Sequence, residues 1–90
     1  MSKERDFENT WNDLSEDAVL VSFAFLPSLG RSVTMKVLST MAGNDVLLNE
    51  GLQELDDISV LVVDNSSEET LYALEVDFYH FVLNKYEREL

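Results

Sequence analysis

The spacing of hydrophobic residues predicts a short helix near the start of the chain. Phe7, Trp11 and Leu14 recur at helical spacing, so we expect a helix from Asp6 to Leu14 with this stripe against the core. Asp6 and Glu8 would interact favourably with the helix dipole at its N-terminus. The alternative is a mobile arm that docks Trp11 on a partner.

The next two apolar segments predict a β-hairpin. Residues 18–26 are rich in Val and Phe on both alternating faces, which is typical of a strand covered on both sides. Residues 27–31 contain Pro and Gly and are expected to turn. Residues 32–41 then alternate between apolar and polar side chains, as a second strand would. A helix over 28–41 stays open, because leucine and valine also recur there every four residues.

A helix and a short strand are expected in the middle of the chain. Asn44 is a favourable N-cap for a helix that reaches about Asp57. Such a helix buries one stripe of leucines, Leu48, Leu52 and Leu55. Gly51 costs it about 1 kcal/mol relative to alanine, which leaves a small hairpin turning at 49–51 as the alternative. The apolar run 58–63 predicts a short, buried central strand.

The last third of the chain predicts a long helix. Ser66 and Glu69 match a capping box, so a helix is expected from Ser67 to about Arg88. A strand over residues 72–78 is the alternative, but it would leave the capping box without a helix.

This expected helix carries two apolar stripes. The first consists of Leu71, Leu74, Phe78, Phe81 and Val82. The second consists of Tyr72, Val76, Tyr79, Leu83, Tyr86 and Leu90. Together they span an arc of roughly 220°, wider than the ~100° stripe of a surface helix. This width predicts a face shared with another molecule, and the alternative is that the chain's own fold covers the helix on two sides.

These elements predict a single α+β domain over residues 1–90. Its order is α-β-β-α-β-α, with a short, partly antiparallel sheet packed against the long C-terminal helix. A chain of this length buries only about 60–65% of its unfolded surface, so its stability is expected to be modest.

Acidic residues dominate the segment from Val37 to Asn84, which contains no lysine or arginine. Its carboxylates are Asp45, Glu50, Glu54, Asp56, Asp57, Asp64, Glu68, Glu69, Glu75 and Asp77. If residues 44–57 are helical, Glu50, Glu54 and Asp57 form a row on one exposed face. The whole chain has a formal net charge of −12, and a charge of one sign at this density favours a basic partner.

The composition excludes several classes of protein. There is no cysteine, so disulfides and thiolate metal sites are absent. The longest apolar run is too short to span a bilayer, and no apolar signal segment follows the first residues, so we expect a cytoplasmic protein without a membrane partner. The negative charge disfavours direct contact with nucleic acid.

No catalytic or cofactor-binding pattern is evident. The single histidine, His80, falls on the polar side of the expected helix, and no nucleophile motif or phosphate-binding loop accompanies it. The carboxylates lack the spacing of a calcium loop, so we expect no metal and no cofactor.

The leading hypothesis is therefore a non-enzymatic acidic binding protein. It would act as a DNA-mimic-like inhibitor that occupies the basic surface of a nucleic-acid-binding protein or nuclease. The alternative is a small adaptor, assembly or immunity protein that acts through its apolar C-terminal helix, with charge incidental. In either case the stripe from Tyr72 to Tyr86 predicts a homodimer.

Overall fold

A small antiparallel sheet and several helices make up the part of the chain that the structure, a computed structural model, describes: residues 7–43, 47–66 and 68–89. The elements in order are α1 (Phe7–Asp13), α2 (Glu16–Ala24), the 3-10 helix η1 (Leu26–Ser28), β1 (Val33–Thr34), α3 (Met35–Ala42), α4 (Leu48–Asp57), β2 (Leu61–Asp64), β3 (Leu71–Leu74) and α5 (Val76–Glu89). The predicted α+β class with a long C-terminal helix is confirmed, and the chain agrees with the predicted order in outline.

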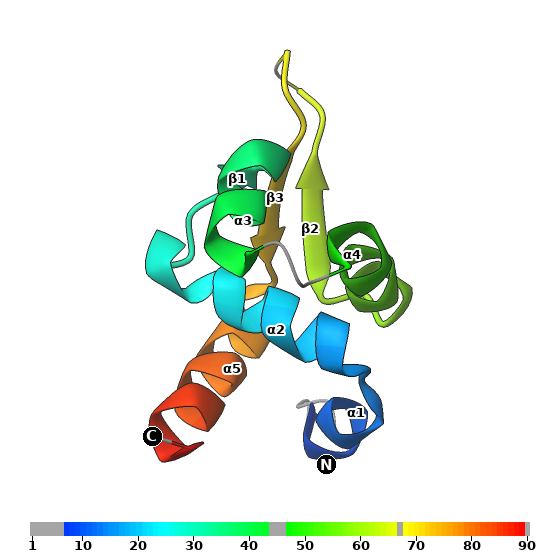
Figure 1. Cartoon of the computed structure of the whole chain (residues 1–90), viewed down its shortest axis with the longest axis vertical. Helices are drawn as coiled ribbons and strands as arrows, with labels where there is room; N and C mark the ends of the chain where they lie inside the picture. Colours follow the sequence, from blue (N-terminus) through cyan, green and yellow to red (C-terminus); the bar gives the residue numbers. More distant parts are fainter. Residues whose placement is uncertain (1–6, 44–46, 67, 90) are drawn as a thin grey trace.

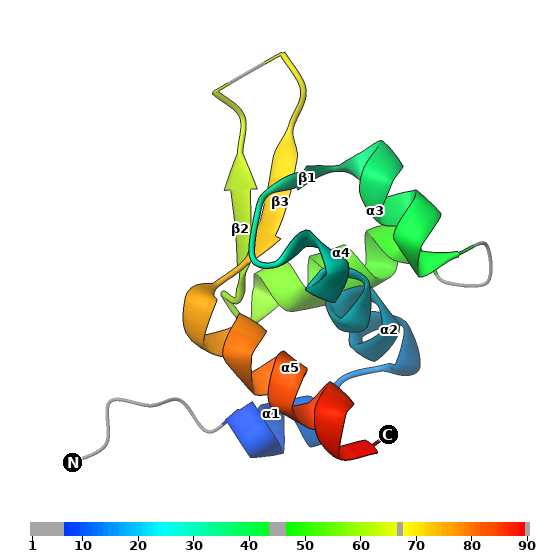
Figure 2. The ribbon, with the colours of Figure 1, turned by 90° about the vertical axis from the view of Figure 1, so that its left-hand side faces the viewer.

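The sheet has the strand order β1-β3-β2, with both pairs antiparallel. Strands β2 and β3 form a hairpin in register from Leu61 opposite Leu74 to Asp64 opposite Leu71. The hairpin projects from the body of the molecule, at the end opposite α1 and α5 (Figure 1). In the view of Figure 2, α3 and α4 lie on one side of this hairpin and α5 lies below it.

The core lies around α2, which contacts α3, α4 and α5. Its largest fully buried apolar side chains are Val21, Phe25, Leu38, Leu55, Val60, Phe78 and Val82. Trp11 of α1 is 8% exposed, and its ring centroid lies 5.6 Å from that of Phe23 and 5.8 Å from that of Phe81. The prediction that α1 places Trp11 on the core is confirmed.

Residues 18–26 form most of helix α2, so the predicted strand is wrong. Ser15 caps this helix, since its hydroxyl accepts a hydrogen bond from the backbone N–H of Ala18 at 3.2 Å. Glu16 and Asp17 occupy the first turn, where the helix dipole favours acidic residues. The helix is surrounded by α3, α4 and α5 and is apolar on most of its surface. A buried helix of this kind lacks the polar face that would distinguish it from a covered strand.

Of residues 32–41, which were expected to form the second strand, only Val33–Thr34 do so. The Thr34 hydroxyl accepts a hydrogen bond from the Val37 N–H at 3.2 Å and so starts helix α3 at Met35. The helical alternative over 28–41 is therefore correct for 35–41 and wrong for 29–34, which contain a turn and β1.

Helix α4 confirms the predicted helix in the middle of the chain, and the alternative hairpin at 49–51 is wrong. Leu52 and Leu55 are buried, while Leu48 packs at the edge of the core. Asn44, the predicted cap, lies outside the described residues.

The C-terminal helix begins at Val76 rather than at residue 67. Ser66 caps no helix, because its hydroxyl and its N–H both donate to Asp64 in the hairpin turn. Glu75 starts α5 instead, with its side chain accepting from the Phe78 N–H at 3.3 Å. The strand alternative over 72–78 is correct for residues 72–74, which belong to the central strand β3, and wrong from Val76, where α5 begins.

Strand β2 differs from the buried central strand predicted at 58–63. It lies at the edge of the sheet, and its side chains are half-buried or exposed. Ile58 and Ser59 belong to the turn before it, and Val60 alone of the segment is fully buried.

Gly51 lies where α4 packs most closely on α2. A Cβ at this position would lie 2.7 Å from Cγ2 of Val21 and 3.0 Å from the carbonyl oxygen of Asp17. Glycine lowers the helix propensity at this position, but because it has no side chain it allows α2 and α4 to pack this closely.

We expect Gly51→Ala to lower the free energy of unfolding by about 1–2 kcal/mol. The steric cost of overpacking is roughly 1–3 kcal/mol and exceeds the gain of about 1 kcal/mol in helix propensity. Denaturant unfolding measures the change, and Asn49→Ala, at an exposed position of the same helix, is the control that should cost little. A stabilised Gly51→Ala variant would contradict the close packing of α2 and α4.

Candidate interaction surface

Helix α4 presents polar and acidic side chains on the face turned away from α2. Its exposed residues are Asn49, Glu50, Gln53, Asp56 and Asp57. The opposite face is fixed to α2 by Leu52 and Leu55, and the N–H of Leu47 donates to the carboxylate of Asp17 at 3.1 Å. The exposed face is therefore held on a rigid element.

The predicted row of Glu50, Glu54 and Asp57 is not a uniform set of free carboxylates. The two oxygens of Glu54 accept hydrogen bonds from the N–H and the hydroxyl of Ser15, both at 2.8 Å. Glu54 thus joins α4 to the start of α2. Glu50 is exposed, and Asp57 is exposed but accepts a hydrogen bond from Gln53 of the preceding turn at 3.0 Å.

The hairpin turn carries the next group of carboxylates. The Ser66 hydroxyl at 2.6 Å, and then its N–H at 2.9 Å, hold the pKa of the Asp64 carboxyl below its usual range. Asp64 therefore keeps its charge to lower pH than an aspartate without these hydrogen bonds. Glu68 and Glu69 are exposed in the same turn.

The remaining predicted acidic residues do not join this group. Glu75 caps α5, and Asp77 is exposed in the first turn of that helix. Asp45 lies outside the described residues. The structure thus places seven carboxylates on two neighbouring elements, four on α4 and three in the segment 64–69.

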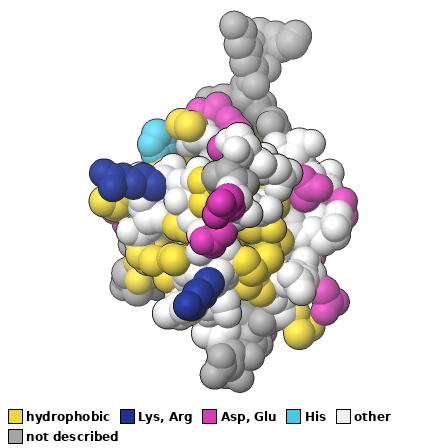
Figure 3. Space-filling model, turned by 90° about the horizontal axis from the view of Figure 1, so that it is seen from above, with side chains coloured by type: hydrophobic (Ala, Val, Ile, Leu, Met, Phe, Trp, Pro, Cys, Tyr) yellow, Lys and Arg dark blue, Asp and Glu magenta, His cyan; other side chains and the backbone are white. Residues whose placement is uncertain are grey.

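Neither α4 nor the hairpin contains a lysine or arginine. Viewed from the hairpin end, Asp and Glu side chains lie near the top, at the centre and on the right of the surface, with hydrophobic side chains between them, and Lys or Arg side chains lie at the left and below the centre (Figure 3). Lys85 and Arg88 lie on α5, where Lys85 pairs with Glu8 of α1, and Arg31 and Lys36 are exposed on either side of β1. The charge within α4 and the hairpin is therefore of one sign.

The predicted apolar stripe is divided between two elements. Tyr72 belongs to β3, whereas Val76, Tyr79, Leu83 and Tyr86 share one face of α5. Val76 is 66% exposed and Tyr86 is 42% exposed, while Tyr79 and Leu83 pack against the core.

A hollow of about 280 Å³ lies at the C-terminal end of this stripe. It is lined by Phe23, Leu26, Pro27, Leu83 and Tyr86. The ring of Phe23 meets that of Tyr86 edge-on, with centroids 5.5 Å apart. The sequence pattern does not indicate this hollow, because it predicts a strand and a turn for residues 23–27.

Other candidate sites receive little support from the described residues. His80 is exposed on α5. Within the described ranges, no three His, Cys, Asp or Glu side chains lie close enough to hold a metal ion. None of the described helices is long and apolar enough to span a membrane.

Helix α4 follows α2, β1 and α3 in the chain and precedes the hairpin β2–β3. In the sheet, β3 lies between β1 and β2. No family model, curated protein or solved structure matches the chain.

Proposed function

We propose that the chain is a non-enzymatic binding protein whose acidic α4 and hairpin occupy the basic surface of a nucleic-acid-binding protein. The observation that carries this proposal is the charge of α4. The order α2-β1-α3-α4-β2-β3 resembles that of a winged helix–turn–helix, in which α4 would be the second helix of the motif. In DNA-binding members of this architecture, that helix enters the major groove. Here it carries four carboxylates and no base.

Electrostatics favours a protein partner over DNA. A duplex carries about one negative charge per 1.7 Å of its axis, and proteins that bind it neutralise phosphates with Lys and Arg. The exposed Glu50, Asp56 and Asp57 would instead repel phosphates. The same side chains on a rigid helix complement the Lys and Arg of a surface that has evolved to hold DNA.

The test is capture of partners from a nuclease-treated lysate, followed by affinity measurements on the purified partner. We expect nucleic-acid-binding proteins to be retained, to be displaced by duplex DNA, and to bind more weakly as salt rises, because a Debye length of ~8 Å at physiological ionic strength screens the attraction. Glu50→Gln with Asp56→Asn and Asp57→Asn should slow association without unfolding the domain. Glu54 is left unchanged because it bonds Ser15. If salt, competitor DNA and this triple change leave the affinity for the partner unchanged, the adaptor hypothesis is favoured instead.

A second candidate function, direct DNA binding, is favoured by the winged helix–turn–helix order itself. Asn49 and Gln53 are exposed on α4, and such amides can read adenine in the major groove. Fold alone does not assign function.

The sign of the salt dependence separates the two candidates. Repulsion between two negative partners weakens as salt screens it, so DNA binding by this chain would strengthen with salt, whereas binding to a basic protein weakens. Duplex DNA titrated at low and at molar salt therefore decides between them.

A further inference from the structure

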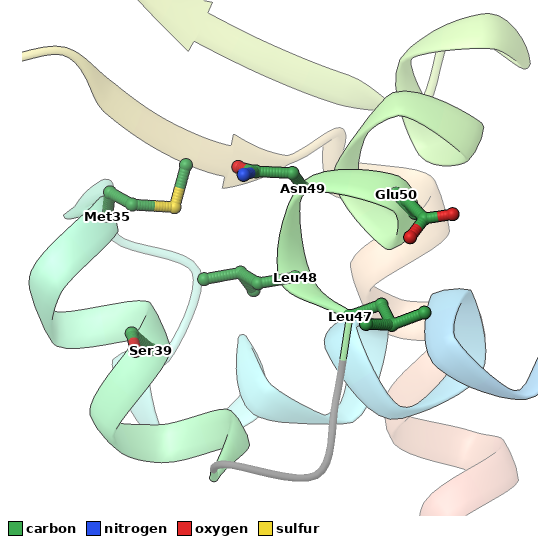
Figure 4. Close-up of a pocket in the computed structure, with 6 residues that line it drawn as sticks. All are labelled: Met35, Ser39, Leu47, Leu48, Asn49 and Glu50. Carbon is green, nitrogen blue, oxygen red and sulfur yellow. The ribbon is translucent and has the colours of Figure 1, made fainter.

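Two adjacent hollows lie beside the N-terminal half of α4. The first, of about 320 Å³, lies between α3 and α4 and includes Met35, Ser39, Leu48 and Asn49. Figure 4 shows Met35 and Ser39 of α3 facing Leu48 and Asn49 of α4, while Leu47 and Glu50 point to the other side.

The second hollow, of about 330 Å³, lies between α4 and the sheet and shares Met35 and Asn49 with the first. Its apolar lining includes Leu52, Leu61, Val63 and Tyr72. We call the two hollows together the α4 groove.

The lining of the α4 groove is apolar at its base and acidic at its margins. Val63 is 42% exposed there, and Met35 supplies a flexible side chain that adapts to different apolar partners. Glu50 and Asp56 are the charged residues among those that line the groove, and both are negative. The side chain of Glu50 points away from Met35 and Ser39 (Figure 4), so its carboxylate lies at the outer edge of the first hollow. Beyond the margins, Asp57 and Asp64 add to the same field. Lys36, next to Met35 on α3, is exposed and has the opposite charge.

We propose that the α4 groove binds a basic amphipathic segment of a partner protein, whose apolar side chains enter the two hollows while its Lys or Arg residues face the acidic margins. This inference rests on the proposed function and adds the chemistry of the partner. The two apolar hollows and the acidic margins match helix-in-groove recognition, in which apolar anchors recur every three or four residues. The carboxylates at the margins would repel phosphates and the headgroups of anionic lipids.

The probe is a short synthetic amphipathic helix of lysine and leucine, labelled for fluorescence anisotropy. A peptide with every leucine replaced by serine keeps the charge and removes the anchors. We expect it to bind at least about tenfold more weakly, because burial of a few aliphatic side chains is worth well over one decade in affinity.

Variants of the protein locate the site. Ser39→Trp fills the first hollow and should weaken peptide binding at least about tenfold, although it makes the surface more apolar. Thr40→Trp is its matched control, since Thr40 is the next exposed residue of α3 and lines neither hollow. Val63→Ser should weaken binding about tenfold, and Val76→Ser, an exposed valine on α5, should leave it within about twofold.

A charge-matched pair separates failure of this inference from failure of the proposed function. Glu50→Gln with Asp56→Asn should weaken peptide binding about fivefold, and Asp77→Asn with Glu87→Gln, which removes equal charge from α5, should weaken it less. If the leucine and serine peptides bind equally well and Ser39→Trp does not change peptide affinity, the inference that the α4 groove binds the segment is wrong, while the proposed acidic function is unaffected. Peptide binding that ignores both salt and the Glu50/Asp56 change would overturn the proposed function. Duplex DNA that binds and is lost in Ser39→Trp would overturn the protein partner in favour of nucleic acid.

Discussion

Trp11→Ala is expected to lower the free energy of unfolding by about 3–5 kcal/mol. Loss of a large buried aromatic leaves a cavity that a small domain cannot close. Trp11 lies among Phe23, Phe78 and Phe81, with ring centroids 5.6–6.2 Å away, so its removal also breaks a network of aromatic contacts. Domains typically have a free energy of unfolding of roughly 5–15 kcal/mol. A loss of this size therefore leaves a large fraction of the molecules unfolded when the domain is only marginally stable.

Equilibrium denaturation measures this change, with two comparisons that fix its cause. Trp11→Phe keeps most of the packing and should recover part of the loss, while Leu29→Ala, at a residue 77% exposed, should cost less than about 0.5 kcal/mol. A Trp11→Ala variant as stable as the unmodified chain would restore the alternative of a mobile N-terminal arm.

The elements that could be predicted from the sequence are those with one apolar and one polar side. Helix α4 shows its leucine stripe because Leu52 and Leu55 face α2 while the other side meets solvent. Helix α2 has no such contrast, because neighbouring elements cover it, and its Val and Phe content then resembles a strand. The secondary structure of this segment therefore depends on its burial in the tertiary structure, which a local sequence pattern does not indicate.

The capping box at 66–69 failed for a different reason. Ser, Asp and Glu serve helix N-termini and tight turns by the same hydrogen bonds, so their spacing alone does not distinguish the two. Here Ser66 bonds Asp64 in the hairpin, and Glu75 starts the helix nine residues later than expected.

For the candidate surface, the sequence located the charge but not its geometry. The segment without bases contains both α4 and the hairpin, which the fold brings together. The sequence pattern does not indicate that Glu54 accepts hydrogen bonds from Ser15, thirty-nine positions away, or that Met35 and Val63 line the same groove. Contacts of that kind depend on the tertiary arrangement.

We also expect the chain to form a two-fold homodimer through the face where α2 meets α5. Leu20, one helical turn before Phe23 on α2, is 40% exposed beside the hollow that Phe23, Leu83 and Tyr86 line. In a two-fold contact, the partly exposed Tyr86 of each copy would enter the hollow of the other. Two chains of charge −12 repel, so contact is less costly on a face that leaves out the exposed carboxylates of α4 and the hairpin and includes the helix that carries Lys85 and Arg88.

Leu20→Glu with Tyr86→Glu is therefore expected to raise the dissociation constant of the dimer at least about a hundredfold, because each carboxylate would be buried without a partner. Leu83 is left unchanged, since it packs against the core and its substitution would test folding rather than association. Leu47→Glu with Val62→Glu adds the same charge at exposed apolar positions on α4 and β2 and is the matched control. Sedimentation over a concentration series measures the equilibrium, circular dichroism verifies that each variant folds, and added salt should tighten the dimer by screening the repulsion between like charges. If the unmodified chain sediments as a monomer throughout that series, the α2–α5 face does not join two copies.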